Sequence, residues 1–218
     1  MDEKIDIYND KYEHIGTSSK KKAHQKGYWH RVFVCVVVNP KTKTIILQKK
    51  VPQRYSFDRP DYIDITVGGH YQAGEKIEKG IRELEEEIGV KTQFKTLAPI
   101  GVRQTACTIN PDYIANEFQH MFLLPLDKKL ESYELEKAEV RGLIEFKVQD
   151  GIDLLLKRVN EIKAKGYFVV DNKKTSYKMK VTKKDFVPAY LNNDKLFLRL
   201  FIASKRFLNG DKTEEILA

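Results

Sequence analysis

The stretch GGHYQAGEKIEKGIRELEEEIGV, residues 68–90, dominates the interpretation of the chain. It opens with two glycines, continues with glutamate-rich sequence of helical spacing, and reaches Gly89, a residue type that commonly ends helices. This acidic run is unexpected in a chain of 218 residues with a formal net charge of +8. Most acidic runs are solvated helix surfaces, and the alternative here is a site for a metal ion.

Helical geometry divides the glutamates, because each residue advances about 100° around the axis. Glu83, Glu86 and Glu87 then share one face, whereas Glu85 points away from it. A separate aliphatic stripe predicts the buried side of the helix: Ile77, Ile81, Leu84 and Ile88. Three like charges on one face repel one another, and a hard cation such as Mg²⁺, or Mn²⁺ in its place, would remove that repulsion.

This pattern resembles the Nudix box, G-x5-E-x7-R-E-U-x-E-E-x-G-U, in which U is a bulky aliphatic residue. Its named positions are occupied by Gly69, Glu75, Arg82, Glu83, Leu84, Glu86, Glu87, Gly89 and Val90. Residues 76–81 separate Glu75 from Arg82, which is one residue fewer than the pattern has. We expect the shortening to lie in the loop or at the start of the helix.

The resemblance implies that Glu83, Glu86 and Glu87 bind divalent metal, and that one of them is a candidate for the general base. It also implies that the loop glutamate, Glu75, supports the loop by pairing with Arg82. The resemblance covers about residues 28–147. The fold that it implies is an α/β/α sandwich with a mixed sheet.

Periodicity elsewhere predicts strands around this helix. Two short strands are expected in residues 5–19, a hairpin in residues 29–50, and further strands at residues 94–100, 118–124 and 143–146. Residues 150–166 and 194–210 are predicted to be helical, with an extended basic segment between them. We expect an α/β protein with one Nudix domain over residues 1–218, an N-terminal hairpin, and a C-terminal helical extension from about residue 150 to residue 218.

The segments AHQKGYWHR, DITVGGHYQAGE and NEFQHMFLL resemble the Nudix branch related to type I isopentenyl-diphosphate isomerase. That isomerase has a catalytic cysteine where this chain has Gly68, and a second glutamate where it has Ala115. Isomerase activity is therefore not expected. His24, His30 and His70 lie at or near the sequence positions where that isomerase has histidine ligands. We interpret His30 and His70 as hydrogen-bonding residues that shape the pocket, with a vestigial metal site of the three histidines as the alternative.

Glu117 begins an apolar strand, and members of the family often take a further metal ligand or base from such a place. We therefore include it among the metal ligands. Glu139 resembles a loop glutamate that some members use as a base. The predicted substrate-binding residues are Arg31, His30, Gly69, His70 and Arg103, and Lys49 and Arg54 are further candidates for contacting phosphate.

Composition limits the remaining possibilities. With 41% hydrophobic and 32% charged residues the chain has a globular composition, and two cysteines are too few for a disulfide framework. Its first thirty residues have no apolar stretch of the kind that a signal peptide requires, and nothing approaches the roughly 18 apolar residues of a membrane span. We expect a cytoplasmic protein with no membrane partner.

The predicted function is metal-dependent hydrolysis of a diphosphate linkage, in a nucleoside diphosphate derivative or a related organic diphosphate. Two alternatives stay open. One is isopentenyl-diphosphate isomerase, and the other is a non-catalytic Nudix module that binds a nucleotide or RNA, which the positive charge of the chain would favour. The expected partner is a small-molecule diphosphate rather than nucleic acid, and a homodimer is left open.

Overall fold

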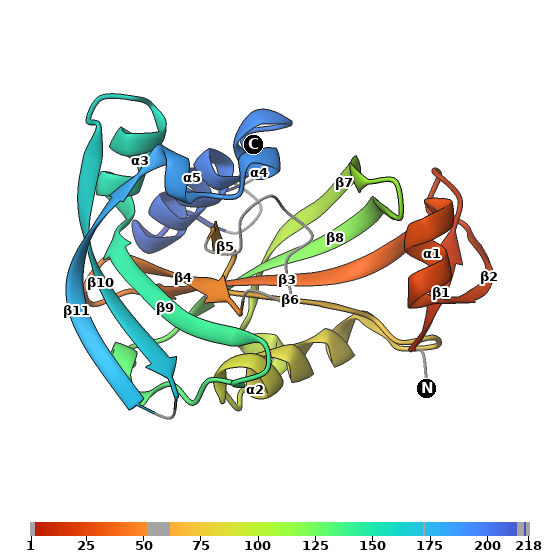
Figure 1. The fold of residues 1–218 in the computed structure, drawn as a ribbon, viewed down its shortest axis with the longest axis horizontal. Coiled ribbons are helices and arrows are strands. Elements are labelled where there is room, and N and C mark those ends of the chain that lie inside the picture. Colours follow the sequence, from red (N-terminus) through yellow and green to blue (C-terminus); the bar gives the residue numbers. More distant parts are fainter. Residues whose placement is uncertain (1–2, 52–61, 172, 213–215, 217–218) are drawn as a thin grey trace.

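The strands form one mixed sheet. The computed structural model describes residues 3–51, 62–171, 173–212 and 216. The strands are β1 (Lys4–Tyr8), β2 (His14–Ser19), β3 (Trp29–Asn39), β4 (Thr44–Lys50), β5 (Ile63–Asp64), β6 (Val67–His70), β7 (Ala98–Asn110), β8 (Tyr113–Pro125), β9 (Val140–Lys147), β10 (Glu161–Val170) and β11 (Lys173–Thr182). Within these described ranges the main path through the sheet is β11-β10-β9-β4-β3-β1-β2 (Figure 1). β3 pairs with β8 in parallel and with β4 antiparallel, so the predicted mixed sheet is confirmed.

Helices cover both faces of this sheet. The α-helices are α1 (Lys20–Lys26), α2 (Arg82–Ile88), α3 (Val148–Leu155), α4 (Pro188–Asn192) and α5 (Leu196–Leu208), and the 3-10 helices are η2 (Ile77–Ile81), η3 (Phe94–Thr96), η4 (Leu130–Ser132) and η5 (Lys183–Asp185). In Figure 1, α2 lies below the sheet, and α3 and α5 lie above it. This is the α/β/α sandwich expected from the sequence.

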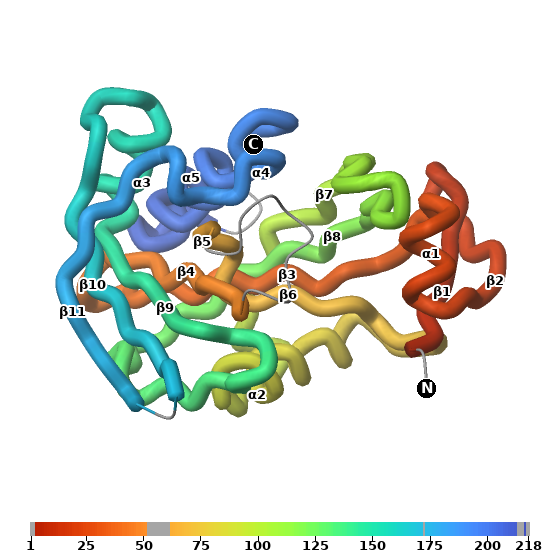
Figure 2. Tube along the Cα trace, in the orientation of Figure 1, coloured from red at the N-terminus to blue at the C-terminus, as the bar shows by residue number. Residues whose placement is uncertain are grey.

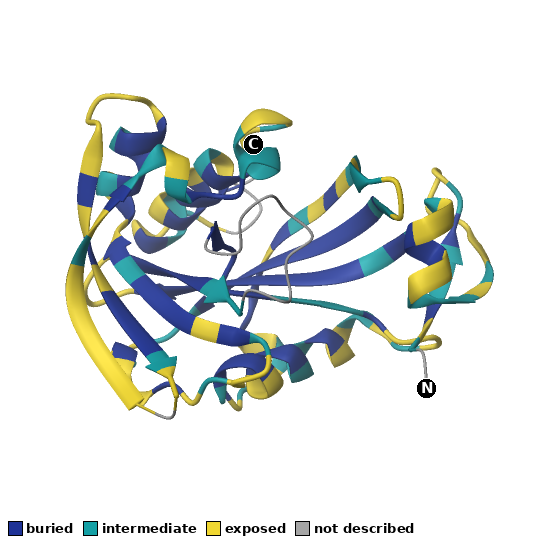
Figure 3. Cartoon of the chain, viewed as in Figure 1, coloured by how far each residue is buried: buried dark blue, intermediate teal, exposed yellow. Residues whose placement is uncertain are grey.

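The central strand β3 explains why both faces are covered. Side chains alternate along a strand, so a continuous apolar run must bury both of its faces. Phe33, Cys35 and Val37 point into the core between the sheet and α2. Val34 and Val36 point into the core that includes α3 and α5. Figure 3 shows the central strands as almost wholly buried.

The missing residue of the motif is absorbed at the start of its helix. Residues Ile77–Ile81 form the 3-10 helix η2, which leads directly into α2 at Arg82. A 3-10 helix rises about 2.0 Å per residue and an α-helix about 1.5 Å, so five residues of η2 span the length of six to seven α-helical residues. The shorter segment therefore reaches as far as the longer one would.

The end of α2 follows the prediction. Gly89 has a φ of 65°, and its N–H donates to the carbonyl of Glu85 at 3.0 Å. A Cβ at this position would also crowd Glu134. Two constraints therefore favour glycine at position 89. The backbone is left-handed there, and Glu134 lies too close for a side chain. On the same helix Leu84 and Ile88 are fully buried, as the aliphatic stripe predicted.

The helix predicted over residues 150–166 is wrong beyond Leu155. α3 ends there, and β10 begins at Glu161 and pairs with β9 and β11. The cause is a change of period: Ile162 and Ala164 are buried whereas Lys163 and Lys165 are exposed. A period of two describes a strand with one buried face.

The other predicted elements are largely confirmed. The N-terminal strands, the hairpin at residues 29–50, the strands at residues 118–124 and 143–146 and the last helix are all present. The predicted strand at residues 94–100 is wrong for its first residues, because η3 forms there and β7 begins only at Ala98. Figure 2 shows the β1–β2 hairpin at one end of the molecule and β10–β11 at the other.

Candidate active site

A cavity of about 450 Å³ brings the acidic helix together with distant parts of the chain. Gly69 and His70 of β6, Glu83 and Glu86 of α2, and Glu117 of β8 all line it. These residues belong to the sheet and to the helix beneath it. The strand and the helix that carry Glu117, Glu83 and Glu86 therefore open into one space, whereas the predicted ligand Glu87 is not among the lining residues.

Gly69 permits the close approach between strand and helix. A Cβ at Gly69 would overlap the carboxyl group of Glu83. Glu83 is only 8% exposed, so its carboxylate has little room to move aside. The second glycine of the pair, Gly68, also lines the cavity. Gly69 thus leaves space for the carboxylate of Glu83.

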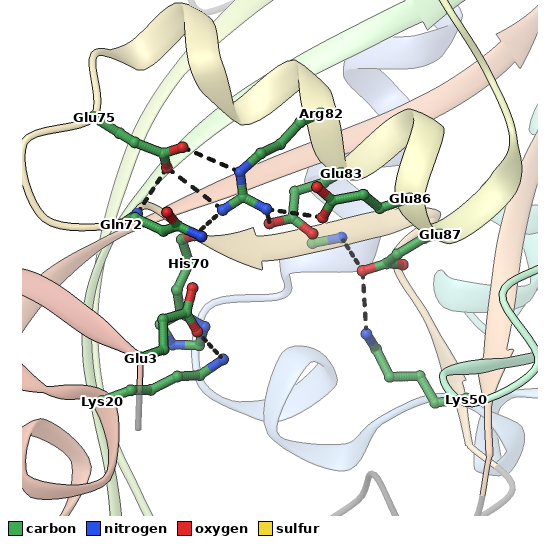
Figure 4. A network of polar contacts seen from close by, with 11 residues as sticks. Glu3, Lys20, Lys50, His70, Gln72, Glu75, Arg82, Glu83, Glu86 and Glu87 are labelled. Atoms are coloured by element: carbon green, nitrogen blue, oxygen red, sulfur yellow. Dashed lines mark hydrogen bonds and ion pairs between the residues drawn. The ribbon is translucent and has the colours of Figure 1, made fainter. Parts of the chain in front are cut away.

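Arg82 lies at the centre of the acidic cluster (Figure 4). Its Nη1 lies 2.7 Å from Glu83 Oε1 and 2.9 Å from Glu86 Oε2. Its Nε donates to Glu75 Oε1 at 3.2 Å, and its Nη2 donates to the carbonyl of His70 at 2.9 Å. The ion pair between Glu75 and Arg82 therefore forms in spite of the shortened spacing, and it ties the loop to the helix.

Glu87 is turned toward a different cation. Its Oε2 accepts a hydrogen bond from Gln48 Nε2 at 2.9 Å, and its Oε1 lies 3.6 Å from Lys50 Nζ (Figure 4). Gln48 and Lys50 are two residues apart on β4, so both point to the same side of the sheet. The side chain of Lys50 is 18% exposed and also lines the cavity.

Burial raises the pKa of Glu83 and of Glu87. Burial is the largest influence on Glu83 and raises its pKa to about 7, against the opposing charge of Arg82 and with added repulsion from Glu87 and Glu86. Burial likewise raises the pKa of Glu87, although Lys50 and Gln48 oppose the shift. Buried carboxylates at this spacing fit a divalent cation, because a cation would lower both their repulsion and their desolvation cost.

Three histidines form a second group of potential ligands. The ring nitrogens of His24, His30 and His70 that could bind a metal lie within 4.8 Å of one another. They come from α1, β3 and β6. His30 Nε2 lies 3.9 Å from Glu117 Oε1 and has no hydrogen-bond partner, although it is buried. A buried nitrogen without a partner is costly unless it binds something else.

The tautomers of these rings favour ligation. His30 Nδ1 donates to the carbonyl of Tyr28 at 2.8 Å, and His24 Nδ1 donates to the carbonyl of Ile114 at 3.2 Å. Each neutral ring then presents the lone pair of its Nε2 to the cluster. Burial lowers the pKa of both to about 4, and it lowers the pKa of His70 well below its ordinary value.

Neutral imidazoles with a carboxylate fit a divalent transition-metal ion. The geometry is compatible with the metal-site alternative, and the interpretation that the histidines shape the pocket stays a prediction. His24 Nε2 and His70 Nε2 lie 3.1 Å apart, close enough to share one proton or one ion. Within the described residues, His24, His30 and His70 form the group of three potential ligands whose ligand atoms all lie within 4.8 Å of one another.

Two predicted phosphate-binding arginines are engaged elsewhere. Arg31 Nη2 donates to the carbonyl of Glu75 at 2.7 Å and to Asp6 Oδ2 at 3.3 Å, so it fastens the loop to β1. Arg103 lines the cavity, but its guanidinium donates to Gln119 and Asp194. Arg54 lies outside the described residues, and Glu139 lines the cavity.

Sequence reasoning missed Lys50 by one residue. It selected Lys49, whereas Lys50 is the side chain that faces Glu87. The signal was present, because Gln48 and Lys50 share a face and Gln48 directly follows the apolar residues Ile45, Ile46 and Leu47. The roles of Gln119 and Asp194 had no local signal, since both depend on strand pairing and on the path of the C-terminal segment.

No helix in the described part of the chain is both long and apolar enough to cross a membrane.

Known proteins resemble the chain along most of its length. An uncharacterized Nudix hydrolase of Clostridium acetobutylicum is 34% identical over 202 residues, which are 91% of this chain and 96% of that protein. Isopentenyl-diphosphate Delta-isomerase 2 of Photorhabdus laumondii is 30% identical over 131 residues, 59% of this chain and 70% of that protein.

A crystal structure of a Deinococcus radiodurans protein shares the fold, with a TM-score of 0.51 and 20% identity over 72% of this chain and 88% of that chain. The family profile described as NUDIX domain matches residues 28–167, which is more than half of the chain. The match contains the glycine pair, α2 and β8, and so Glu83, Glu86 and Glu117 of the cavity. The chain belongs to the Nudix family and is an enzyme of the Nudix hydrolase type.

Proposed function

We propose that this protein is a metal-dependent hydrolase that cleaves the diphosphate linkage of a nucleoside diphosphate derivative or a related organic diphosphate. One observation carries the proposal: the Nudix carboxylates Glu83 and Glu86 line a cavity that also holds the cation Lys50. A diphosphate needs positive charge on both phosphates, and the cavity offers a metal-ligating face opposite a lysine.

The residues of the cavity divide the chemistry among them. Glu83, Glu86 and Glu87 would hold Mg²⁺ or Mn²⁺, which when bound supplies positive charge to phosphate oxygens and lowers the pKa of a water molecule. Lys50 neutralises the phosphate that leaves. Arg82 orients Glu83 and Glu86, because it contacts both carboxylates.

Proton transfer is assigned to Glu83. Glu83 lines the cavity and is only 8% exposed, which places its carboxylate to accept a proton from a water molecule held there. The water oxygen bonds to one phosphorus, the bond from that phosphorus to the bridging oxygen breaks, and the bridging oxygen leaves with the other phosphate. Glu83 accepts the proton that the water loses.

The test is a panel of nucleoside diphosphate derivatives and other organic diphosphates, assayed with Mg²⁺ and with Mn²⁺. We expect hydrolysis of at least one member, and we expect Glu87→Gln to lower its rate by about 10²-fold or more. Glu85→Gln is the matched control, because Glu85 lies on the same helix, is exposed and pairs with Lys91. Unchanged turnover in Glu87→Gln would contradict the proposal.

The histidine group favours one second candidate, isomerisation of isopentenyl diphosphate. His24, His30, His70 and Glu117 converge, and the Photorhabdus relative is named as such an isomerase. Against it, Gly68 lines the cavity without a thiol. Incubation with isopentenyl diphosphate and proton NMR of the product distinguishes the two: dimethylallyl diphosphate indicates isomerisation, and phosphate release indicates hydrolysis.

The single-domain organisation, the cytoplasmic location and the small-molecule substrate expected from the sequence belong to the same proposal. The homodimer is left open.

A further inference from the structure

A chain of four side chains connects the C-terminal segment to the histidine group. Asp194 follows α4 and accepts two hydrogen bonds from Arg103, from Nε at 2.7 Å and from Nη2 at 3.0 Å. Arg103 Nη1 donates to Gln119 Oε1 at 2.8 Å. Gln119 Nε2 in turn donates to Glu117 Oε2 at 2.6 Å, and the other oxygen of Glu117 lies 3.9 Å from His30 Nε2.

The order of donors along this chain is fixed by chemistry. A guanidinium can only donate, so Arg103 requires the carbonyl oxygen of the Gln119 amide. The amide nitrogen must then face the other way, and it donates to Glu117. Because Arg103 and Gln119 are both buried, reversing the amide would leave a buried donor facing a donor. The carboxylate of Asp194 thus sets the orientation of an amide that it does not touch.

Strand register brings the middle of the chain together. Arg103 stands opposite Gln119 in the β7–β8 pair, and Glu117 stands beside His30 in the β3–β8 pair. Glu117 and Gln119 are two residues apart on β8 and share a face. Only Asp194 comes from outside these three strands.

The C-terminal segment holds Arg103 from two directions. Asp194 binds the edge of its guanidinium, and the ring of Tyr190, on α4, lies 5.6 Å from its central carbon. Asp194 is itself held by Arg199 of α5, whose Nη1 donates to Oδ2 at 3.1 Å. The side chain of Arg103 is 4% exposed, so its charge has little access to water and depends on these partners.

We propose that Asp194 is a positioning residue, which fixes Glu117 beside the histidine group through Arg103 and Gln119. The segment from α4 to α5 then completes the metal-ligating site rather than only covering the core. This inference rests on the proposed function only where hydrolysis is measured. Its main measurement is metal affinity, which does not require that the protein hydrolyses a diphosphate. The competing account is that Asp194 and Arg103 only fasten the C-terminal helices.

The test compares Asp194→Asn with Asp153→Asn. Asp153 is a matched control: it pairs with Arg158 on the C-terminal part of the chain, and its side chain is 28% exposed against 31% for Asp194. Co²⁺ is titrated into each metal-free protein and followed by its visible absorption, and the melting temperature is recorded alongside. Partners of metal ligands typically contribute about 10- to 100-fold to affinity, so we expect about a tenfold loss for Asp194→Asn and none for Asp153→Asn.

A double-mutant cycle identifies the route. Gln119→Met removes the link while keeping a similar shape. If the effect of Asp194 passes through Gln119, adding Asp194→Asn to Gln119→Met changes Co²⁺ affinity little further. If the losses of Co²⁺ affinity in the two single variants multiply in the double variant, the proposal is wrong. So would a lower melting temperature in Asp194→Asn with unchanged Co²⁺ affinity, since that result describes a fastening role only.

Failure of this inference is distinguishable from failure of the proposed function. If the wild-type protein binds Co²⁺ but hydrolyses no diphosphate, the proposed function is wrong. A loss of Co²⁺ affinity in Asp194→Asn would then still support the role of Asp194. Wild-type protein that hydrolyses a diphosphate while Asp194→Asn keeps its Co²⁺ affinity contradicts the role of Asp194 alone. Wild-type protein that binds no Co²⁺ overturns that role as well, because no site then remains to be completed.

Discussion

The acidic face of α2 and the histidine group each contribute residues to the cavity, but they are assembled in opposite ways. Glu83, Glu86 and Glu87 come from consecutive turns of one helix, whereas the histidines come from α1, β3 and β6. A ligand set on one helix is visible in the spacing of the sequence. A ligand set built from three elements depends on strand register and becomes visible only in the fold.

The two groups also differ in how their charge is compensated. The carboxylates already contact cations, since Arg82 holds Glu83 and Glu86 and Lys50 faces Glu87. The histidines are neutral, and one of their nitrogens is buried without a partner. The first arrangement suits a hard cation that arrives with phosphate, and the second suits a transition-metal ion held by nitrogen.

The largest expected effect comes from removing the acid on the helix. Glu83→Gln keeps the size of the side chain and removes both a metal ligand and the proposed base, so we expect hydrolysis to fall by about 10²- to 10⁴-fold. Initial rates at saturating Mg²⁺ measure this. Glu85→Gln is expected to retain the wild-type rate, and a comparable loss in both variants would show that the face of the helix is irrelevant.

Gly69→Ala should affect the same group without changing its chemistry. The added methyl overlaps the carboxyl group of Glu83, whose side chain must shift. Misplacement of a catalytic group by about 1 Å costs on the order of 10²-fold in rate, and we expect a loss of that size with a folded protein. Rates measured together with far-ultraviolet circular dichroism check it. Wild-type activity would mean that Glu83 need not lie against the strand.

His30→Gln separates the two groups. Loss of one imidazole should lower Co²⁺ affinity by more than the roughly 10- to 100-fold that loss of a ligand's partner costs, because the site loses a nitrogen ligand itself. Mg²⁺ binding at the carboxylates should change little. Co²⁺ absorption and Mg²⁺ calorimetry measure the two affinities in parallel, and equal losses for both ions would indicate one site instead of two.

The remaining expected effect is on stability without metal. Burial raises the pKa of Glu83 from 4.5 to about 7, so the folded state keeps a proton that the unfolded state releases. The free energy of unfolding therefore falls as the pH rises from 4.5 to about 7 and is level above that, by at most about 3 kcal/mol. Melting temperatures in EDTA should show a shallower decline for Glu83→Gln. A decline identical to that of the wild type would refute the burial effect.

The sequence predicted the parts of the fold that have local causes. The period of α2, its end at Gly89 and the strands with apolar runs all follow from residues close together in the chain. The helix predicted beyond Leu155 was wrong because leucines and valines fit either period over short segments, and pairing with β9 decided the outcome.

The site divides in the same way. The glutamates of α2 were identified from spacing, and their surroundings were not. Lys50 was missed because only the orientation of β4 distinguishes it from Lys49, and Asp194 was missed because its partner Arg103 lies far away in the sequence. Long-range contacts of this kind leave no periodic pattern.

The most direct test of the central claim is hydrolysis in water enriched in ¹⁸O, with mass spectrometry of the products. The account predicts that the wild-type protein with Mg²⁺ releases two phosphorylated products and that one of them carries a single ¹⁸O on phosphorus, because water attacks there. Glu83→Gln should give almost no labelled product in the same time. Label on carbon, or an isomerised substrate without label, would contradict the account.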